Sequence, residues 1–333
     1  METDESLISA ARRGDLTAVR RILVLDVNYS DEHGWTALMY AVKGGHDEVV
    51  KYLMRRGAHF DQPDSSGWTP LMRAAREGHN EIVQIFIAAT GKTDVNYSDE
   101  HGWTALLRAS QKRHTEVIET LIEAGAEVDQ ANQRGETALM FAAQKRDIRT
   151  VRVLIKAKAT VDQVDGHGRT ALMFAAQEGD MDSVKALVEA RASTNKADED
   201  GMTAAMYAAR RGNMMVLEYL LENTKELSSD TARAIYDRLS KRNRQVPWAR
   251  KKNIALMAQS SEKEDTKMRV LLRLCSCMDI KRRPWKMRGW IRNVKRTKTL
   301  IDASVLHPDL RPIVTEYLGF IPAPDYKRTV ESR

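Results

Sequence analysis

The sequence predicts an all-α fold: a solenoid of helix-turn-helix units, followed by a smaller basic helical region. Three observations support this. A Thr-Ala-Leu, Thr-Pro-Leu or Thr-Ala-Ala triplet recurs with spacings of 33, 35, 33, 33 and 33 residues, at Thr36, Thr69, Thr104, Thr137, Thr170 and Thr203. Each triplet precedes two stretches whose apolar residues recur at helical intervals. Most stretches end at a glycine, which readily adopts the left-handed conformation that stops a helix.

The unit over residues 34–61 illustrates the pattern. Thr36 precedes the first helix, where its hydroxyl can accept a hydrogen bond from a free N–H group. Gly45 and Gly57 stand where the two helices should stop. Two apolar stripes lie between these signals, at Leu38, Ala41 and Val42 and at Val49, Val50, Leu53 and Met54. One helical hairpin cannot bury both faces, so we expect neighbouring units to stack.

The G-x-T-x-L pattern at a period of 33 resembles the ankyrin repeat over about Glu5–Thr224. This resemblance implies a β-turn finger followed by two antiparallel helices in each unit. The family usually places histidine after T-P-L, where it ties adjacent repeats by hydrogen bonds. Here the residues are Met39, Met72, Leu107, Met140, Met173 and Met206. We therefore expect apolar packing to replace that network. Basic residues occupy four left-handed glycine positions, at Arg113, Arg146, Lys158 and Arg191.

The period also sets the predicted boundaries. Residues 6–23 contain two helices without a preceding finger, so we expect a capping repeat that exposes Arg12, Arg13, Arg20 and Arg21. The predicted ankyrin domain spans 5–224, with the cap at 5–30 and repeats at about 31–63, 64–98, 99–131, 132–164, 165–197 and 198–224. The one spacing of 35 indicates an insertion at Thr90–Thr93, in the loop before a finger.

Ankyrin arrays bind partners through the finger tips and the exposed face of each first helix. The resemblance therefore implies a non-enzymatic interaction scaffold or adaptor, which we expect to be a monomer with no cofactor and no metal. The matching positions are Glu32, His33, Trp35, Lys43, Ser65, Ser66, Trp68, Arg76, Glu100, His101, Trp103, Gln111, Arg134, Glu136, Gln144, His167 and Arg169. The same strip includes Gln133, Gln177, Glu199, Asp200, Met202 and Arg210.

Three tryptophans, Trp35, Trp68 and Trp103, stand in register although the repeat does not demand a large aromatic residue there. Tryptophan is enriched at interface hot spots, so the row could anchor a partner. The competing interpretation is that each indole shields the neighbouring finger. A mutation of Trp68 to alanine that lowers the melting temperature without changing partner affinity would favour the second interpretation.

The stretch DVNYSDEHGWTAL occurs twice, at 26–38 and 94–106, an offset of two repeats. Duplication of a pair of repeats explains the identity, and so does one binding surface kept twice at Glu32/Glu100, His33/His101 and Trp35/Trp103. His46, His79 and His114 share one turn between helices, which indicates a structural role. Asn28 and Asn96 match glycosylation sequons, but we interpret them as finger-loop residues.

Signatures of catalysis and membrane insertion are missing from the sequence. The TGKT at 90–93 lacks the glycine that a phosphate-binding loop needs five residues before Gly91. Cys275 and Cys277 support neither a disulfide framework nor a metal site. No run of about 18 apolar residues occurs, and the N-terminus METDESLISA is polar and acidic, unlike a signal peptide. We expect a cytoplasmic protein that can also be nuclear.

Charge divides the chain. Residues 1–224 carry 27 Lys+Arg against 34 Asp+Glu, and residues 225–333 carry 26 against 12. The most basic stretch, 281–298, has nine basic residues, no acidic residue and two tryptophans, and its candidate contact residues are Lys281, Arg282, Arg283, Trp285, Trp290, Lys295 and Arg296. This stretch could be a solvated helix, bind an acidic partner or nucleic acid, serve nuclear import, attach to an acidic membrane, or dock on the acidic repeats.

Helical patterns continue after residue 224, at about 228–243, 261–280 and 304–320. The last of these resembles the short helical boxes that couple ankyrin proteins to ubiquitin-ligase cores. Two alternatives to a simple scaffold therefore stay open: a substrate-recognition subunit of a ubiquitin ligase, or a nuclear, nucleic-acid-associated adaptor that uses the basic region.

Overall fold

The computed structural model describes residues 4–22, 26–89 and 94–224, and all its regular elements there are helices apart from two isolated β-bridges, Ser30–Thr36 and Ala197–Thr203. The first helices of the repeats are α1 (Asp4–Arg13), α3 (Ala37–Gly44), α5 (Pro70–Glu77), α7 (Ala105–Lys112), α9 (Ala138–Gln144), α11 (Ala171–Glu178) and α13 (Ala204–Arg211). The second helices are α2 (Leu16–Arg21), α4 (Asp47–Arg55), α6 (Asn80–Ala88), α8 (Thr115–Glu123), α10 (Ile148–Lys156), α12 (Met181–Glu189) and α14 (Met214–Asn223).

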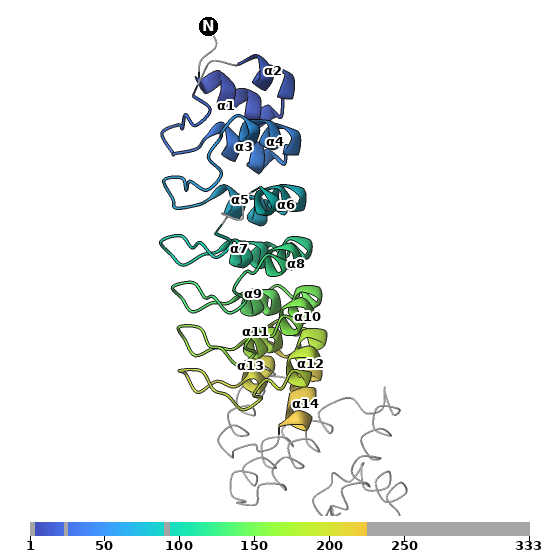
Figure 1. The fold of residues 1–333 in the computed structure, drawn as a ribbon. Coiled ribbons are helices and arrows are strands. Elements are labelled where there is room, and N and C mark those ends of the chain that lie inside the picture. Colours follow the sequence, from blue (N-terminus) through green and yellow to red (C-terminus); the bar gives the residue numbers. More distant parts are fainter. Residues whose placement is uncertain (1–3, 23–25, 90–93, 225–333) are drawn as a thin grey trace, which may run out of the picture. The chain divides into compact units, whose positions relative to one another are not determined.

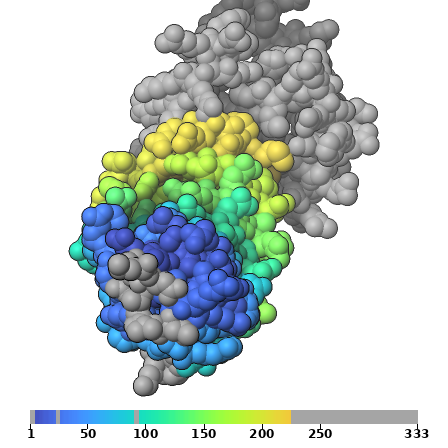
Figure 2. Space-filling view, turned by 90° about the horizontal axis from the view of Figure 1, so that it is seen from above, coloured from blue at the N-terminus to red at the C-terminus, as the bar shows by residue number. Residues whose placement is uncertain are grey.

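The helices stack in two rows, as the sequence predicts for an all-α solenoid. Each first helix packs against its own second helix and against the first helices of the adjacent repeats, and the second helices form a parallel row. The finger loops project from one side of this array (Figure 1). In Figure 2 the N-terminal cap faces the viewer and the later repeats follow behind it in chain order. Arg12, Arg13, Arg20 and Arg21 are exposed on the cap, as predicted.

Threonine caps start the first helices after the cap repeat. The hydroxyl oxygens of Thr36, Thr69, Thr104, Thr137, Thr170 and Thr203 each accept a hydrogen bond from the backbone N–H three residues on, at 3.2 to 3.4 Å. The prediction made from the repeated triplet is confirmed at all six positions. These contacts satisfy N–H groups that have no partner inside the helix.

Left-handed residues end the helices, and four of them are not glycine. Arg113, Arg146, Lys158 and Arg191 have φ values of 68°, 57°, 65° and 69°, so the sequence prediction is confirmed. Glycines take the corresponding place in the other repeats, as Gly45 and Gly57 do with φ of 70° and 87°. A side chain in this conformation costs about 1 to 2 kcal/mol, because Cβ approaches the carbonyl oxygen.

Replacing Lys158 with glycine is therefore expected to stabilise the array. Relief of the left-handed strain, about 1 to 2 kcal/mol, exceeds the roughly 0.5 to 1 kcal/mol that glycine costs through the unfolded chain. We expect a net gain near 1 kcal/mol, measured as a higher urea midpoint of the full chain. Lys156→Gly is the matched control, since Lys156 is also exposed but helical, and it should lower stability. A lower midpoint for Lys158→Gly would contradict the strain argument.

Apolar packing fills the stack, but polar contacts also join the repeats. The residues after the triplet, from Met39 to Met206, are buried as expected. The expectation that apolar packing alone joins the repeats was incomplete. The Nε2 atoms of His46, His79 and His114 lie 3.2, 3.3 and 3.0 Å from the carbonyl oxygens of Arg12, Lys43 and Arg76 in the preceding repeat. A carbonyl only accepts, so each Nε2 donates, and the histidines predicted to be structural tie neighbouring repeats.

These histidine rings need glycine in the preceding repeat. A Cβ added to Gly14, Gly45 or Gly78 would lie 2.4 to 2.7 Å from the ring of His46, His79 or His114, respectively. Where Arg113 and Arg146 replace the glycine, the next repeat carries Asp147 and Asp180 in place of histidine. The basic residues at left-handed positions therefore occur where no ring occupies the space.

Several sequence predictions lie outside the described residues. They are the insertion at Thr90–Thr93, the helices and cysteines after residue 224, the basic contact residues between Lys281 and Arg296, and the box-like helix at 304–320. Within the described ranges, no helix is long and apolar enough to cross a membrane, and no group of three His, Cys, Asp or Glu residues could hold a metal ion.

Candidate protein-binding surface

An acidic or amide side chain closes each finger, and it is buried in every finger but the first, where Asp31 is half-buried. The Oδ1 atoms of Asp31, Asp64, Asp99, Asn132, Asp165 and Asp198 accept hydrogen bonds from the backbone N–H groups two and four residues on, at 2.7 to 3.0 Å. The finger tip lies between these two donors. Its shape is therefore fixed from inside the fold, and the tip side chains remain at the surface.

The second oxygen of the same side chain usually reaches the first helix. Asp31 and Asp198 accept hydrogen bonds from the hydroxyls of Tyr40 and Tyr207, at 2.7 and 2.6 Å. Asp64 and Asp99 form ion pairs with Arg73 and Arg108, and the Asp99 Oδ2 to Arg108 Nη2 distance is 2.8 Å. In all four cases the partner is nine residues after the acid, so one spacing connects each of these fingers to its helix.

Burial and these hydrogen bonds shift the titration of the partner groups. Burial, helped by the bond to Asp198, raises the pKa of Tyr207 to about 12. Burial also lowers the pKa of Arg73 to about 10 and lowers that of Arg108. At a pKa of about 10, Arg73 stays protonated at neutral pH.

The fifth predicted unit uses another spacing. Arg169, four residues after Asp165, donates to it through Nε and Nη2 at 2.8 and 2.7 Å. Asn132 donates to Glu136 at 2.8 Å in the preceding repeat. Glu136 and Arg169, predicted as partner-binding residues, are therefore half-buried and bonded within their own fingers.

The three tryptophans belong to a ladder of alternating rings and guanidinium groups. The Arg73 Cζ lies 3.6 Å from the centroid of Trp35 and 5.2 Å from that of Trp68. The Arg108 Cζ lies 3.9 Å from Trp68 and 4.1 Å from Trp103. Trp35 and Trp103 also contact Tyr40 and Phe141, at ring centroid distances of 5.0 and 5.1 Å. We call these residues the Trp–Arg ladder: Tyr40, Trp35, Arg73, Trp68, Arg108, Trp103 and Phe141.

The ladder bears on both interpretations of the tryptophan row. Trp35, Trp68 and Trp103 are half-buried, and guanidinium groups of their own and neighbouring repeats cover the ring faces. A cation over an indole is attracted by the negative face of the ring. The repeats tolerate large aromatic residues at this place because arginines stack between them, which favours the interpretation that the indoles shield the fingers.

The remaining predicted residues lie where a partner can reach them. Exposed tip residues are Glu32, His33, Ser65, Ser66, Glu100, His101, Gln133, Arg134, His167, Glu199 and Asp200. In the last turns of the first helices, Lys43, Gln144 and Arg210 are exposed and Arg76, Gln111 and Gln177 are half-buried. Met202 was predicted as part of this strip, which is wrong. It is 4% exposed, since it takes the place of a tryptophan at the finger base and its N–H donates to Asp198.

Backbone hydrogen bonds link neighbouring finger tips. The N–H groups of Ser65, Gln133, Gly166 and Glu199 donate to the carbonyl oxygens of His33, His101, Arg134 and His167 in the preceding fingers, at 3.3, 2.9, 2.7 and 3.1 Å. The tip of one repeat is therefore held by its neighbour. Such a preorganised edge can bind a partner at a low cost in conformational entropy.

Most positions of the duplicated stretch have the same structural role in both copies. Asn28 and Asn96 each donate to a carbonyl one repeat on, Gly57 or Gly125, at 3.3 Å. Each Oδ1 also accepts the N–H of residue 59 or 127, at 2.8 Å. Each asparagine therefore joins the loop before its finger to the corresponding loop of the next repeat. The side chains of Glu32–His33 and Glu100–His101 are exposed instead. Within each pair, the two side chains contact each other at 3.7 Å.

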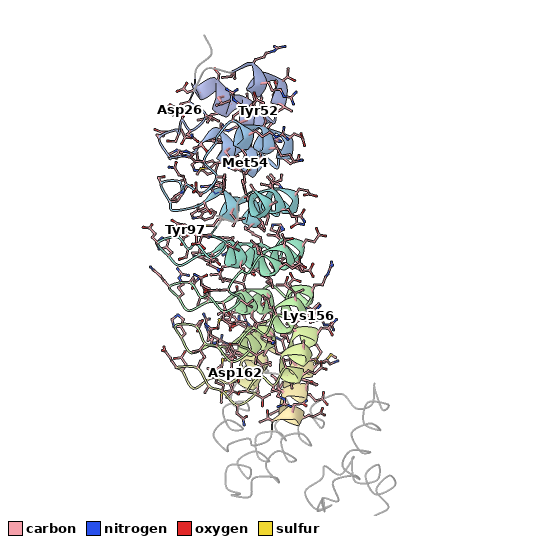
Figure 3. All side chains as sticks on the ribbon, viewed as in Figure 1. Asp26, Tyr52, Met54, Tyr97, Lys156 and Asp162 are labelled. Atoms are coloured by element: carbon pink, nitrogen blue, oxygen red, sulfur yellow. The ribbon has the colours of Figure 1, made fainter. Side chains whose placement is uncertain are left out.

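Residues at the base of this surface escaped the sequence analysis. Arg73, Arg108 and Tyr40 belong to the ladder and bond to the aspartates that close three fingers, yet none was singled out. The signal was an aspartate at the start of four of the six fingers, followed nine residues later by arginine or tyrosine. In Figure 3, Tyr97 lies at the base of a finger and Lys156 on the side of the second helices, which marks the two sides of the array.

Comparisons with known proteins match short parts of the chain. It is similar to the human NAD-capped RNA hydrolase NUDT12, 41% identical over 51 residues, which are 14% of this chain and 11% of that protein. Human ankyrin repeat domain-containing protein 40 is 42% identical over 60 residues, 17% of this chain and 16% of that protein. Mouse ankyrin repeat, SAM and basic leucine zipper domain-containing protein 1 is 37% identical over 60 residues, 17% and 13% of the two chains.

The matches to these relatives thus span less than a fifth of each relative's length, and the activities of those whole proteins are not assigned to this chain. The family model for ankyrin repeats in three copies matches residues 7–99, 57–132, 78–165 and 139–233. Together these ranges cover 7–233, more than half of the 333-residue chain. The triplet period, the finger geometry and this match agree, and the chain belongs to the ankyrin-repeat family.

Proposed function

We propose that this protein is a non-enzymatic adaptor that binds a partner protein across its finger tips and the exposed last turns of its first helices. Ankyrin repeats are protein-interaction modules, and their binding surface runs along the array. The observation that supports this surface most directly is the line of exposed finger tips whose backbones are hydrogen-bonded to one another. We further propose that the protein acts as a monomer, in the cytoplasm and also in the nucleus.

Affinity capture with the full chain, followed by mass spectrometry, tests the proposal. Glu32→Arg and Glu100→Arg change the two copies of the same tip, and both side chains are exposed, so neither should alter stability. Lys156→Glu, an exposed change on the side of the second helices, is the matched control. We expect the double tip variant to lose captured partners by at least several-fold, and the control to keep them.

The outcomes separate the alternatives. Equal capture by the double tip variant and the control would contradict binding at the fingers. Loss of capture in each single variant would show that both copies of the duplicated tip are used, whereas retention in both singles would leave duplication of repeats as the explanation. Capture of cullin or elongin-type proteins would favour the ubiquitin-ligase function that residues 304–320 suggest, and capture of nucleic acid would favour the third alternative.

A further inference from the structure

One position recurs along the exposed side of the first helices. It stands two residues before the left-handed residue at the helix end: Gly14, Gly45, Gly78, Arg113, Arg146 and Gly179 in the first six repeats. The residues at this position, which we call the helix-end row, are Arg12, Lys43, Arg76, Gln111, Gln144 and Gln177. Arg210 follows in the last repeat. The row thus begins with three cations and continues with three uncharged amides.

Aromatic rings hold the three cations. Arg12 Cζ lies 4.3 Å from the ring centroid of Tyr40. Lys43 Nζ and Arg76 Cζ lie 5.2 and 5.4 Å from Trp35 and Trp68. A flexible cation placed over a ring loses less entropy on binding than a free one, so its charge is presented in a defined place.

The backbone at these three positions is held as well. The carbonyl oxygens of Arg12, Lys43 and Arg76 are the groups that accept hydrogen bonds from the histidines of the next repeats. No equivalent histidine follows Gln111 or Gln144, because Asp147 and Asp180 stand there. The three cations are therefore fixed at both the backbone and the side chain.

The charges of the row remain available to a partner. Within the described part of the chain, neither Arg12 nor Lys43 forms an ion pair, and both are exposed. Arg76 pairs only with the adjacent Glu77, at 3.0 Å, and both side chains are more than a third exposed. Such an exposed pair is worth little, about 0 to 1 kcal/mol, so a carboxylate of a partner can compete for the guanidinium.

We propose that Arg12, Lys43 and Arg76 bind carboxylates of an extended acidic segment of a partner protein, and that Gln111, Gln144 and Gln177 hydrogen-bond the backbone of the same segment where it is uncharged. This inference rests on the proposed function and specifies the partner. An amide side chain offers both a donor and an acceptor, which suits a peptide backbone. Among the first six repeats, cations occupy only the first half of the row, and Arg210 returns in the seventh. This pattern fits a peptide with acidic residues at the end that lies on the first three repeats.

The repeat spacing sets the spacing of the acidic residues. Stacked helices lie about 8 to 10 Å apart, and an extended peptide advances about 3.3 Å per residue. One repeat therefore corresponds to about three peptide residues. The peptide segment that fits the row carries a glutamate or aspartate at every third position, one for each of the first three repeats. A uniformly charged polyanion such as a nucleic acid fits less well, because the next three positions of the row offer no positive charge.

Fluorescence anisotropy with the full chain tests the inference. The probe is a labelled peptide with glutamate at positions 1, 4 and 7 and serine or alanine elsewhere, compared with a peptide of the same composition whose glutamates are adjacent. The row variant is R12Q/K43Q/R76Q, and the matched control is R55Q/R152Q/K156Q, which removes three exposed cations from the second helices. We expect the row variant to weaken binding of the spaced peptide at least tenfold, and the control to change it less than twofold.

Additional measurements keep the outcome interpretable. Lys43→Glu alone should weaken the spaced peptide several-fold without changing the melting temperature, since Lys43 is exposed. Equal weakening by the row and control variants, no binding of the spaced peptide to the unaltered chain, or equal affinity for both peptides would overturn the inference. So would an oligonucleotide that competes as well as the peptide. A captured partner that needs the finger tips but is indifferent to the row variant would overturn this inference and leave the proposed function intact.

Discussion

Replacing Arg108 with phenylalanine is expected to lower the free energy of unfolding by about 3 to 5 kcal/mol, because it leaves a buried carboxylate without its counter-ion. The side chain of Asp99 is 0% exposed and that of Arg108 is 10% exposed, and their ion pair spans 2.8 Å. Phenylalanine should fit the space, since Phe141 takes the same position in the next repeat and stacks on Trp103. The loss therefore reports the buried charge more than the packing.

A second substitution separates these two causes. Asn132 replaces the aspartate in the repeat that carries Phe141, and it closes its finger with the same two backbone hydrogen bonds. The double variant D99N/R108F reproduces this combination in the preceding repeat. We expect it to recover most of the stability that R108F loses, since no buried charge remains. D99N alone should also cost stability, because its Oδ1 closes the finger and its Nδ2, a donor, would face the guanidinium of Arg108, which also only donates.

Urea unfolding of the full chain, followed by circular dichroism at 222 nm, measures these variants. A repeat array can unfold in parts, so the slope of the transition has to be compared as well as its midpoint. Lys112→Phe is the matched control, since Lys112 is an exposed residue in the last turn of the same helix. If R108F unfolds at the midpoint of the unaltered chain, or D99N/R108F is no more stable than R108F, the ion pair does not have the role assigned to it.

Local rules explain what the sequence alone could predict. The threonine caps and the four basic residues at positive φ follow from spacing within one repeat, and the period of 33 carries them to every unit. A cap or a left-handed stop needs only its own helix, so the pattern determines it. The exposed tips were predicted for the same reason, because they lie between the two signals that bound each finger.

Contacts between repeats were the part that could not be predicted. The Trp–Arg ladder depends on side chains from adjacent repeats meeting at one level, and Arg73 touches Trp35 from the repeat before it. The histidines likewise donate to carbonyls of the preceding repeat. Such pairs are distant in sequence and vary from unit to unit, so the recurring tryptophan and histidine positions do not reveal which residues they contact. The prediction that Met202 lies on the binding strip was wrong for the same reason. Met202 takes the tryptophan position in a repeat outside the Trp–Arg ladder, and it is buried there.

Replacing Trp68 with alanine is expected to lower the free energy of unfolding by about 2 to 3 kcal/mol, somewhat less than a fully buried tryptophan would cost. Three guanidinium groups contact this one indole: Arg108 at 3.9 Å, Arg73 at 5.2 Å and Arg76 at 5.4 Å. Without the ring, Arg73 and Arg108 lose a neighbour while their aspartates stay buried. The destabilisation should therefore spread to the second and third fingers.

Trp68→Phe is the matched control, because it keeps an aromatic face for Arg108 and should restore most of the lost stability. Thermal unfolding of the full chain gives the stability of each variant, and binding of a captured partner is measured well below both melting temperatures. If the indole shields the fingers, alanine lowers the melting temperature while the folded variant keeps its affinity for the partner. If alanine leaves the melting temperature unchanged and partner affinity falls at least tenfold, the indole is a binding anchor and the ladder contributes little to the fold. Arg73 of the same repeat and Arg108 of the next repeat both stack on Trp68. We therefore expect the first result, since removing a group that joins two repeats weakens the interface between them.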